Sequence, residues 1–165
     1  MEFRIENLEA FKIAGYVKSS TNAAMQGMTD CPAFWKEIME TGKTGQIAEL
    51  ITKPPYGLIG ASVYQVDEQD PMRFDYYIAA ATDLPTPEGF AEYTVPAMTW
   101  AVFPCTAETS AQTQMAIVME WAPSADYELL NSGYETGRMI SAAPDLEVYG
   151  KGNEVEIWVP VRAQG

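Results

Sequence analysis

The sequence predicts an α+β domain in which two tandem strand-helix-strand-strand modules share one antiparallel sheet, with both helices on one side of it. The chain has 165 residues, of which 47% are hydrophobic, so it can form one buried core but is too short for two ordinary domains. Segments with strand-like alternation are separated by two segments with helical periodicity. The same order of segments occurs twice along the chain, which indicates an internal duplication.

The first half of the chain contains one complete set of elements. Residues 3–17 alternate as strands do. Asp30 can cap a helix that starts at Cys31-Pro32, because a carboxylate accepts free backbone N–H groups and proline suits the first turn. Phe34 and Trp35 begin the apolar stripe of this helix, and we expect both in the core. Strand-forming residues follow at 56–66 and 74–80.

The second half repeats this order. It contains an extended segment at 90–104, a helix at 110–122 that Pro123 ends, and strands at 146–149 and 155–161. Matching landmarks lie at nearly constant offsets: Phe11 and Tyr93 (93 − 11 = 82), Phe34 and Met115 (115 − 34 = 81), and Phe74 and Val155 (155 − 74 = 81).

We therefore assign residues 1–165 to a single domain with an internal repeat at about 3–83 and 90–163. Halves of this size cannot bury a sheet alone, so we expect them to share one sheet. Two similar modules related by a pseudo-twofold axis leave a cleft where they meet. We expect a ligand to bind in that cleft.

The composition excludes several classes of function. Ten Lys and Arg residues against 23 Asp and Glu give a formal net charge of −13, which disfavours direct binding to nucleic acids and to anionic membranes. The absence of histidine removes catalytic His dyads and His-ligated metals. The two cysteines, Cys31 and Cys105, do not have the spacing of a zinc site. No apolar run is long enough to cross a bilayer, so we expect a cytoplasmic protein without a metal or cofactor.

Six short motifs then occur in the order seen in the GyrI-like small-molecule-binding family, which this sequence resembles from about residue 3 to 161. They are FDYYIAA from Phe74, YTVP from Tyr93, TWAVF from Thr99, EWAPSADYE from Glu120, DLEVY from Asp145 and EIWVPV from Glu156. The family includes effector-binding domains of AraC-type and MerR-type multidrug regulators as well as free-standing proteins. No DNA-binding domain fits beside the predicted elements, so we expect the free-standing form.

The resemblance implies a cleft of aromatic side chains around a buried glutamate, which binds lipophilic and often cationic compounds. The match to EWAPSADYE makes that glutamate Glu128, preceded by Tyr127. Residues 131–141 are an insertion relative to the family and contain a second Tyr-Glu pair, so Glu135 is the alternative occupant. The ring candidates are Trp100, Trp121, Tyr127, Tyr149, Trp158, Tyr64 and Tyr77.

Two further acidic residues, Glu147 and Glu156, lie within otherwise apolar strands. Strand alternation places Glu156 on one face with Trp158, so it faces either solvent or the cleft. We count Glu156 among the ligand-binding candidates, as a residue that holds the hydrogen bonds of the site.

Three functions remain open at this point. The first is a protein that binds amphipathic small molecules, with Glu128 as the charge anchor. The second is a hydrolase of cyclopropanoid or other electrophilic toxins, a function that the resemblance implies because the family includes such enzymes. Glu128 would then be the general base and Tyr127 the proton donor. The third is a protein-protein inhibitor of DNA gyrase, because the acidic surface can occupy a basic DNA channel and the family that the sequence resembles includes a gyrase inhibitor. A regulator is the other possible protein partner. The sequence leaves open whether the protein is an enzyme.

Overall fold

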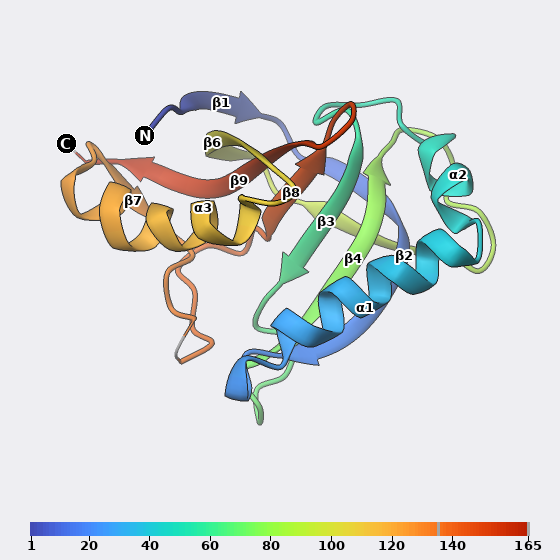
Figure 1. Cartoon of the computed structure of the whole chain (residues 1–165), viewed down its shortest axis with the longest axis horizontal. Coiled ribbons are helices and arrows are strands. Elements are labelled where there is room, and N and C mark those ends of the chain that lie inside the picture. Colours follow the sequence, from blue (N-terminus) through green and yellow to red (C-terminus); the bar gives the residue numbers. More distant parts are fainter. Residues whose placement is uncertain (135, 165) are drawn as a thin grey trace.

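The computed structural model describes residues 1–134 and 136–164 (Figure 1). Within these residues, eight strands form one antiparallel sheet in the order β1-β6-β9-β8-β3-β4-β2-β5, and β7 pairs with β9. Three α-helices accompany the sheet, so the predicted α+β class with a shared antiparallel sheet is confirmed. The first four strands are β1 (Arg4–Leu8), β2 (Phe11–Thr21), β3 (Leu58–Val63) and β4 (Arg73–Ala81). The others are β5 (Ala91–Val95), β6 (Met98–Thr106), β7 (Tyr127–Leu129), β8 (Asp145–Tyr149) and β9 (Glu154–Ala163).

The helices lie on one face of the sheet. They are α1 (Gly27–Glu40), α2 (Lys43–Ala48) and α3 (Ser110–Ala116), and α3 continues as a π-helical turn at Ile117–Trp121. Figure 1 shows α1 in front of β4 and β2, and α3 in front of β9. The central pair of the sheet is β3 and β8. Strands β4 and β2 of the first half lie beyond β3, and β9 and β6 of the second half lie beyond β8. The two edge strands are exchanged between the halves, because β1 pairs with β6 and β5 pairs with β2.

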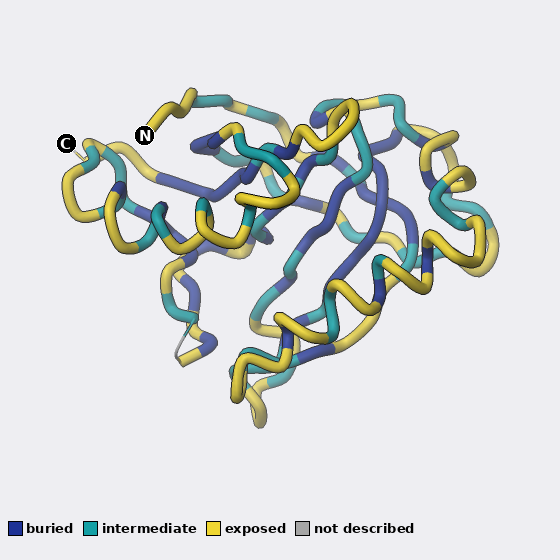
Figure 2. Tube along the Cα trace, viewed as in Figure 1, coloured by how far each residue is buried: buried dark blue, intermediate teal, exposed yellow. Residues whose placement is uncertain are grey.

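Two apolar clusters attach the helices to the sheet. In the first, Phe34 and Ile38 of α1 pack with Ile47 of α2 against the inner strands of the first half. In the second, Ile117 and Trp121 pack against β6 and β9. A third cluster covers the opposite face of the sheet, so the central strands are buried while the outer surfaces of the helices are exposed (Figure 2). Because each helix covers its own half, the middle of the helical face lies between two packed clusters.

Three local predictions are corrected by the structure. The predicted strand segment ends at residue 17, whereas β2 continues to Thr21, because its register with β4 runs to Thr21↔Arg73. Helix α1 begins at Gly27, before Asp30. The Asp30 carboxylate accepts hydrogen bonds from Ser20 Oγ at 2.8 Å and from Gln26 Nε2 at 2.9 Å, so it is not the cap of this helix.

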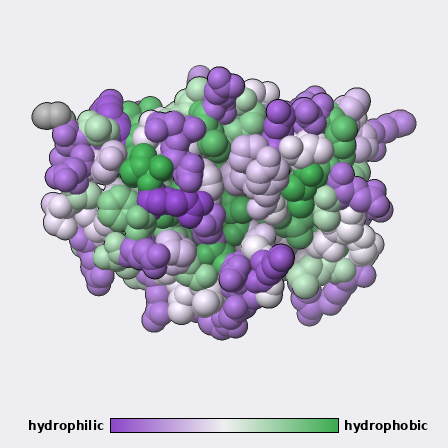
Figure 3. All heavy atoms as spheres, turned by 90° about the horizontal axis from the view of Figure 1, so that it is seen from above, coloured by the Kyte–Doolittle hydropathy of each residue, from purple (hydrophilic) through white to green (hydrophobic). Residues whose placement is uncertain are grey.

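The surface is polar, in keeping with the net charge of −13. Figure 3 shows mostly hydrophilic side chains on the face seen from above, with hydrophobic atoms visible between them. No helix among the described residues is both long and apolar enough to cross a membrane.

Candidate functional site

A groove of about 510 Å³ opens on the helical face of the sheet, between α1 and the start of α3. Its floor comes from β4 and β8, and most of its remaining lining comes from α1. The lining residues are Cys31, Pro32, Trp35, Lys36, Met39, Glu40, Tyr76, Ser110, Glu147 and Tyr149. This volume lies in the range of sites for drug-sized molecules.

Glu147 is the acidic side chain of the groove floor, and phenols hold it in place. Tyr76 Oη donates to Glu147 Oε1 at 2.6 Å, and Tyr149 Oη donates to Glu147 Oε2 at 3.3 Å. Trp35 Nε1 in turn donates to Tyr76 Oη at 2.7 Å. The chain of hydrogen bonds from α1 through β4 to β8 therefore fixes the carboxylate.

The electrostatic environment of Glu147 is unfavourable for its negative charge. Burial raises the pKa of Glu147, and the hydrogen bonds from Tyr76 and Tyr149 oppose that shift only in part. Among the described residues, no Lys or Arg forms an ion pair with Glu147. Lys36 also lines the groove, but its Nζ lies 3.9 Å from Glu40, and both side chains are mostly exposed. Within the part of the chain that the structure describes, the carboxylate at the floor therefore has hydrogen-bond donors and no counterion.

The position of Glu147 follows from strand pairing. Glu147 lies opposite Gly60 in the β3-β8 register. A Cβ atom on residue 60 would lie 2.2 Å from Tyr76 Oη and 2.9 Å from Glu147 Oε1. Gly60 therefore provides the space in which the phenol and the carboxylate meet.

Aromatic rings form the sides of the groove near this carboxylate. Trp35 and Tyr149 make an edge-to-face contact, with ring centroids 4.7 Å apart and an interplanar angle of 61°. Aromatic faces attract cations, and a desolvated carboxylate attracts them more strongly. The groove therefore places aromatic surface next to a buried carboxylate.

A family model described as Cass2, integron-associated effector binding protein, matches residues 4–161. The chain belongs to this family. The match confirms the resemblance to GyrI-like proteins and supports small-molecule binding as the general function. No curated protein matches the sequence.

Solved structures with the same fold share little sequence with this Cass2-family chain. SAV2435 bound to tetraphenylphosphonium has a TM-score of 0.77 at 19% identity, over 98% of this chain and 94% of that one. A putative transcription regulation protein from Staphylococcus aureus MU50 has a TM-score of 0.74 at 18% identity, over 99% of both chains. An integron cassette protein from Vibrio cholerae has a TM-score of 0.60 at 20% identity, over 97% of this chain and 95% of that one.

The predicted anchor, Glu128, lies outside the groove. Strand β7 pairs with the C-terminal end of β9, so Glu128 is opposite Arg162. Arg162 Nε donates to Glu128 Oε2 at 3.0 Å, and the Glu128 side chain is 37% exposed. Tyr127, half-buried at the edge of the α3 cluster, does not line the groove either. The placement of Glu128 as the buried acid is therefore wrong, and Glu135 lies outside the described residues.

Most of the predicted aromatic residues also lie outside the groove. Trp100, Trp158 and Tyr77 belong to the core on the sheet face opposite the groove, because they alternate with residues that face the helices. Trp121 packs against Phe103 beneath the π-helical turn, with ring centroids 4.9 Å apart. Of the seven predicted rings, Tyr149 lines the groove, whereas Tyr64 contacts Asp145 further along the sheet.

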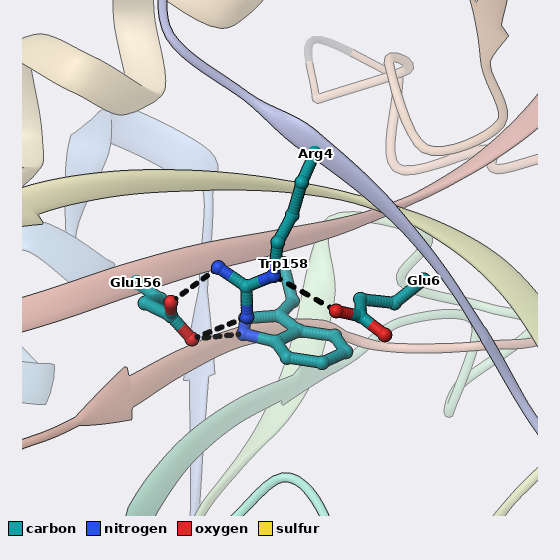
Figure 4. A network of polar contacts seen from close by, with 4 residues as sticks. All are labelled: Arg4, Glu6, Glu156 and Trp158. Carbon is teal, nitrogen blue, oxygen red and sulfur yellow. Dashed lines mark hydrogen bonds and ion pairs between the residues drawn. The ribbon is translucent and has the colours of Figure 1, made fainter.

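Glu156 already has a cation partner within the chain. Figure 4 shows its carboxylate facing the guanidinium of Arg4, with Arg4 Nη1 2.6 Å from Glu156 Oε2. Trp158 Nε1 donates to Glu156 Oε1 at 3.2 Å, and the Arg4 guanidinium lies 5.7 Å from the centre of the Trp158 ring. Arg4 Nε also donates to Glu6 at 2.8 Å. Glu156 and Trp158 therefore hold Arg4 and do not line the groove.

Sequence reasoning did not name three of the groove residues as site candidates: Glu147, Tyr76 and Trp35. Trp35 was expected in the core, yet it lines the groove because it lies beside the buried residue Phe34 at the margin of the apolar stripe of α1. A glutamate in the apolar strand 146–149 was the available signal for Glu147.

Proposed function

We propose that this protein binds lipophilic organic cations in the groove, with Glu147 as the counterion. The observation that carries this proposal is a sheltered carboxylate with phenol donors and no cationic partner among the described residues. A charge taken from water is costly unless a group of opposite charge accompanies it. A ligand cation supplies that charge.

The chemistry of the groove favours a large, apolar cation over a small hydrated one. Trp35 and Tyr149 offer aromatic surface beside the carboxylate, and each cation-π contact contributes about 0.5–2 kcal/mol. Met39 adds a flexible thioether at the margin, 63% exposed, and such side chains adapt to ligands of different shape. The relative SAV2435 in complex with tetraphenylphosphonium supports the same ligand class.

We favour binding over hydrolysis for this groove. A general base must take a proton from water, and the phenol hydrogen bonds to both oxygens of Glu147 stabilise its charged form and so weaken it as a base. Glu128 and Tyr127, the predicted catalytic pair, are away from the groove. No observation favours gyrase inhibition.

The sheet order, which reads β1-β6-β9-β8 and β5-β2-β4-β3 from the two edges, supports one domain built from an internal repeat at about 3–83 and 90–163.

The test is a titration with tetraphenylphosphonium, followed by tryptophan fluorescence. Trp35 lies in the groove wall, so binding should quench its emission. Glu147→Gln keeps the shape of the side chain and removes its charge, and we expect it to weaken binding about 100-fold. Glu156→Gln is the matched control, since Glu156 lies on the adjacent strand and faces the other side of the sheet. Absence of saturable binding, or equal affinity in wild type and Glu147→Gln, would overturn the proposal.

A further inference from the structure

A second carboxylate with no cation partner lies beside the groove. Asp145 Oδ2 accepts hydrogen bonds from Tyr134 Oη at 2.6 Å and from Tyr64 Oη at 3.0 Å. Its Oδ1 accepts a hydrogen bond from Asn131 Nδ2 at 3.1 Å. Among the described residues, no Lys or Arg forms an ion pair with Asp145. The proposed function makes no use of this cluster.

Asp145 and Glu147 face the same side of the sheet. They lie two residues apart in β8, opposite Ser62 and Gly60 of β3, so their Cα atoms are about 7 Å apart. Burial raises the pKa of Asp145 to about 6, and the charge of Glu147 contributes to that shift. Two carboxylates that form no ion pair within residues 1–134 and 136–164 therefore lie next to each other on one strand.

The Asp145 cluster also contains a buried acceptor that lacks a donor. Asn131 is 1% exposed. Its Nδ2 donates to Ala143 O at 2.7 Å as well as to Asp145, whereas its Oδ1 has no hydrogen-bond partner among the described residues. A buried acceptor without a donor is unfavourable. A carboxylate with a nearby amide oxygen suits a positively charged group that carries several N–H donors, such as an ammonium or amidinium.

Tyr134 covers this cluster from the segment between β7 and β8. Its phenol donates to Asp145, and its ring makes an edge-to-face contact with Tyr64, with centroids 5.9 Å apart. The groove residues do not include Tyr134, Tyr64 or Asp145, so the cluster is closed off from the groove. The neutral O–H of Tyr134 occupies the position that an N–H group of a ligand would take at Asp145.

We propose that Asp145 is a second subsite of the groove, which opens when Tyr134 moves aside and then binds an ammonium or amidinium group. The ligand class is then a lipophilic cation that carries a second, protonated amine about 7 Å from the first charge. This inference rests on the proposed function, because the first charge binds at Glu147. The two carboxylates together select dications over monocations of the same size.

Two ligands that differ in one amine test the inference: pentyltriphenylphosphonium and (5-aminopentyl)triphenylphosphonium. Titrations run at pH 8, where Asp145 is ionised, because its pKa is about 6, and where a primary alkylamine is protonated. We expect wild type to bind the amine compound at least tenfold more tightly than the pentyl compound. Asp145→Asn should abolish that difference, because both compounds then bind through Glu147 alone. Tyr134→Phe keeps the ring but removes the competing O–H, so it should increase the difference.

The outcomes separate this inference from the proposed function. Equal affinity of wild type for both compounds would overturn the Asp145 subsite while leaving cation binding at Glu147 intact. A preference for the amine that survives in Asp145→Asn would also overturn it, because the amine would then bind elsewhere. Failure of both compounds to bind would overturn the proposed function, and the inference with it. The comparison in wild type holds even where a variant does not fold.

Discussion

Glu147 and Glu156 lie on neighbouring strands of one sheet, yet their environments differ. Val148 is paired with Glu156 in the β8-β9 register, so the two glutamates face opposite sides. Burial raises the pKa of Glu147, and its phenol donors do not reverse the shift. Burial also raises the pKa of Glu156, but the hydrogen bonds and charge of Arg4, helped by Trp158, outweigh it and lower the pKa overall.

The difference is the presence of a cation. Glu156 has a guanidinium within hydrogen-bond distance and a tryptophan ring beneath it, which is the arrangement that we propose for a ligand at Glu147. The chain thus satisfies one carboxylate internally and leaves the other to an external partner. A carboxylate without a counterion costs stability in the free protein, and a binding site regains that cost when its ligand arrives.

Apart from removing the Glu147 charge itself, the largest expected effect comes from filling the space beside Glu147. In Gly60→Ala, the new Cβ collides with Tyr76 Oη and approaches Glu147 Oε1, so the phenol and the carboxylate must shift. We expect a loss of about 30-fold in tetraphenylphosphonium affinity and about 1–3 kcal/mol in unfolding free energy. Fluorescence titration and urea denaturation measure the two quantities.

Gly45→Ala is the matched control for this substitution. A Cβ at Gly45 meets no atom within 4 Å, and alanine stabilises a helix relative to glycine by up to about 1 kcal/mol. We expect unchanged affinity in Gly45→Ala. If Gly60→Ala also retained wild-type affinity, the orientation of Glu147 by Tyr76 would be irrelevant to binding.

The next effect is a pH dependence that differs between the two glutamates. The pKa of Glu147 is raised above its ordinary value of 4.5, so the charged form needed for binding is lost as the pH falls through that raised value. Tetraphenylphosphonium does not titrate, and below the raised pKa its affinity should fall about tenfold per pH unit. Isothermal titration calorimetry across the pH range measures the affinity in wild type and in Asp145→Asn. The substitution removes the second carboxylate that titrates in this range. A flat profile in wild type would contradict the assignment of Glu147.

Protein stability should respond to pH in opposite directions at the two sites. A raised pKa means that the Glu147 contribution to stability is full below 4.5 and is lost as the pH rises through the raised value. A lowered pKa means that the Glu156 contribution is present above 4.5 and is lost as the pH falls through the lowered value. Comparing the unfolding free energies of Glu147→Gln and Glu156→Gln across pH separates the two contributions.

The sequence was sufficient to predict the fold class but not the identity of the anchor. Alternation and helical spacing depend on neighbouring residues, so they predicted the antiparallel sheet and the helices on one face. Glu147 and Glu156 both lie in apolar strands, and their local patterns do not distinguish them. The deciding contact is Arg4 to Glu156, which joins residues 152 positions apart. Such a contact depends on the tertiary packing of β1 against β6.

The motif that suggested Glu128 could not predict the surroundings of that side chain. Glu128 follows a turn and belongs to a three-residue strand, so its surroundings depend on which strand it pairs with. Pairing with β9 brings it to Arg162 at the surface. The surroundings of Trp35 on α1 were equally hard to predict from local sequence. A residue at the margin of an apolar stripe faces either the core or a groove, and which one depends on the elements packed opposite it.

A smaller effect is expected from removing the internal cation. Arg4→Met keeps an apolar side chain over Trp158 but removes the guanidinium from Glu156 and Glu6. Arg4 is 46% exposed and Glu156 32% exposed, so solvent screens the pair, and we expect a loss of about 1–2 kcal/mol in unfolding free energy. Affinity at the groove should stay within twofold of wild type, because the network lies on the other sheet face. A larger change in affinity would mean that the two glutamates are coupled.

The smallest effect is expected at the ion pair between Glu128 and Arg162. Both side chains are exposed, at 37% and 58%, and exposed pairs contribute about 0–1 kcal/mol because water and salt screen them. Glu128→Gln should therefore leave tetraphenylphosphonium affinity unchanged and lower the unfolding free energy by no more than about 0.5 kcal/mol, with the difference reduced further at high salt. Arg162→Gln should behave in the same way, since it removes the other half of the pair. A loss of binding in Glu128→Gln that Arg162→Gln does not share would show that Glu128 acts on the ligand by itself and would overturn the contrast between a groove carboxylate and the internally paired ones.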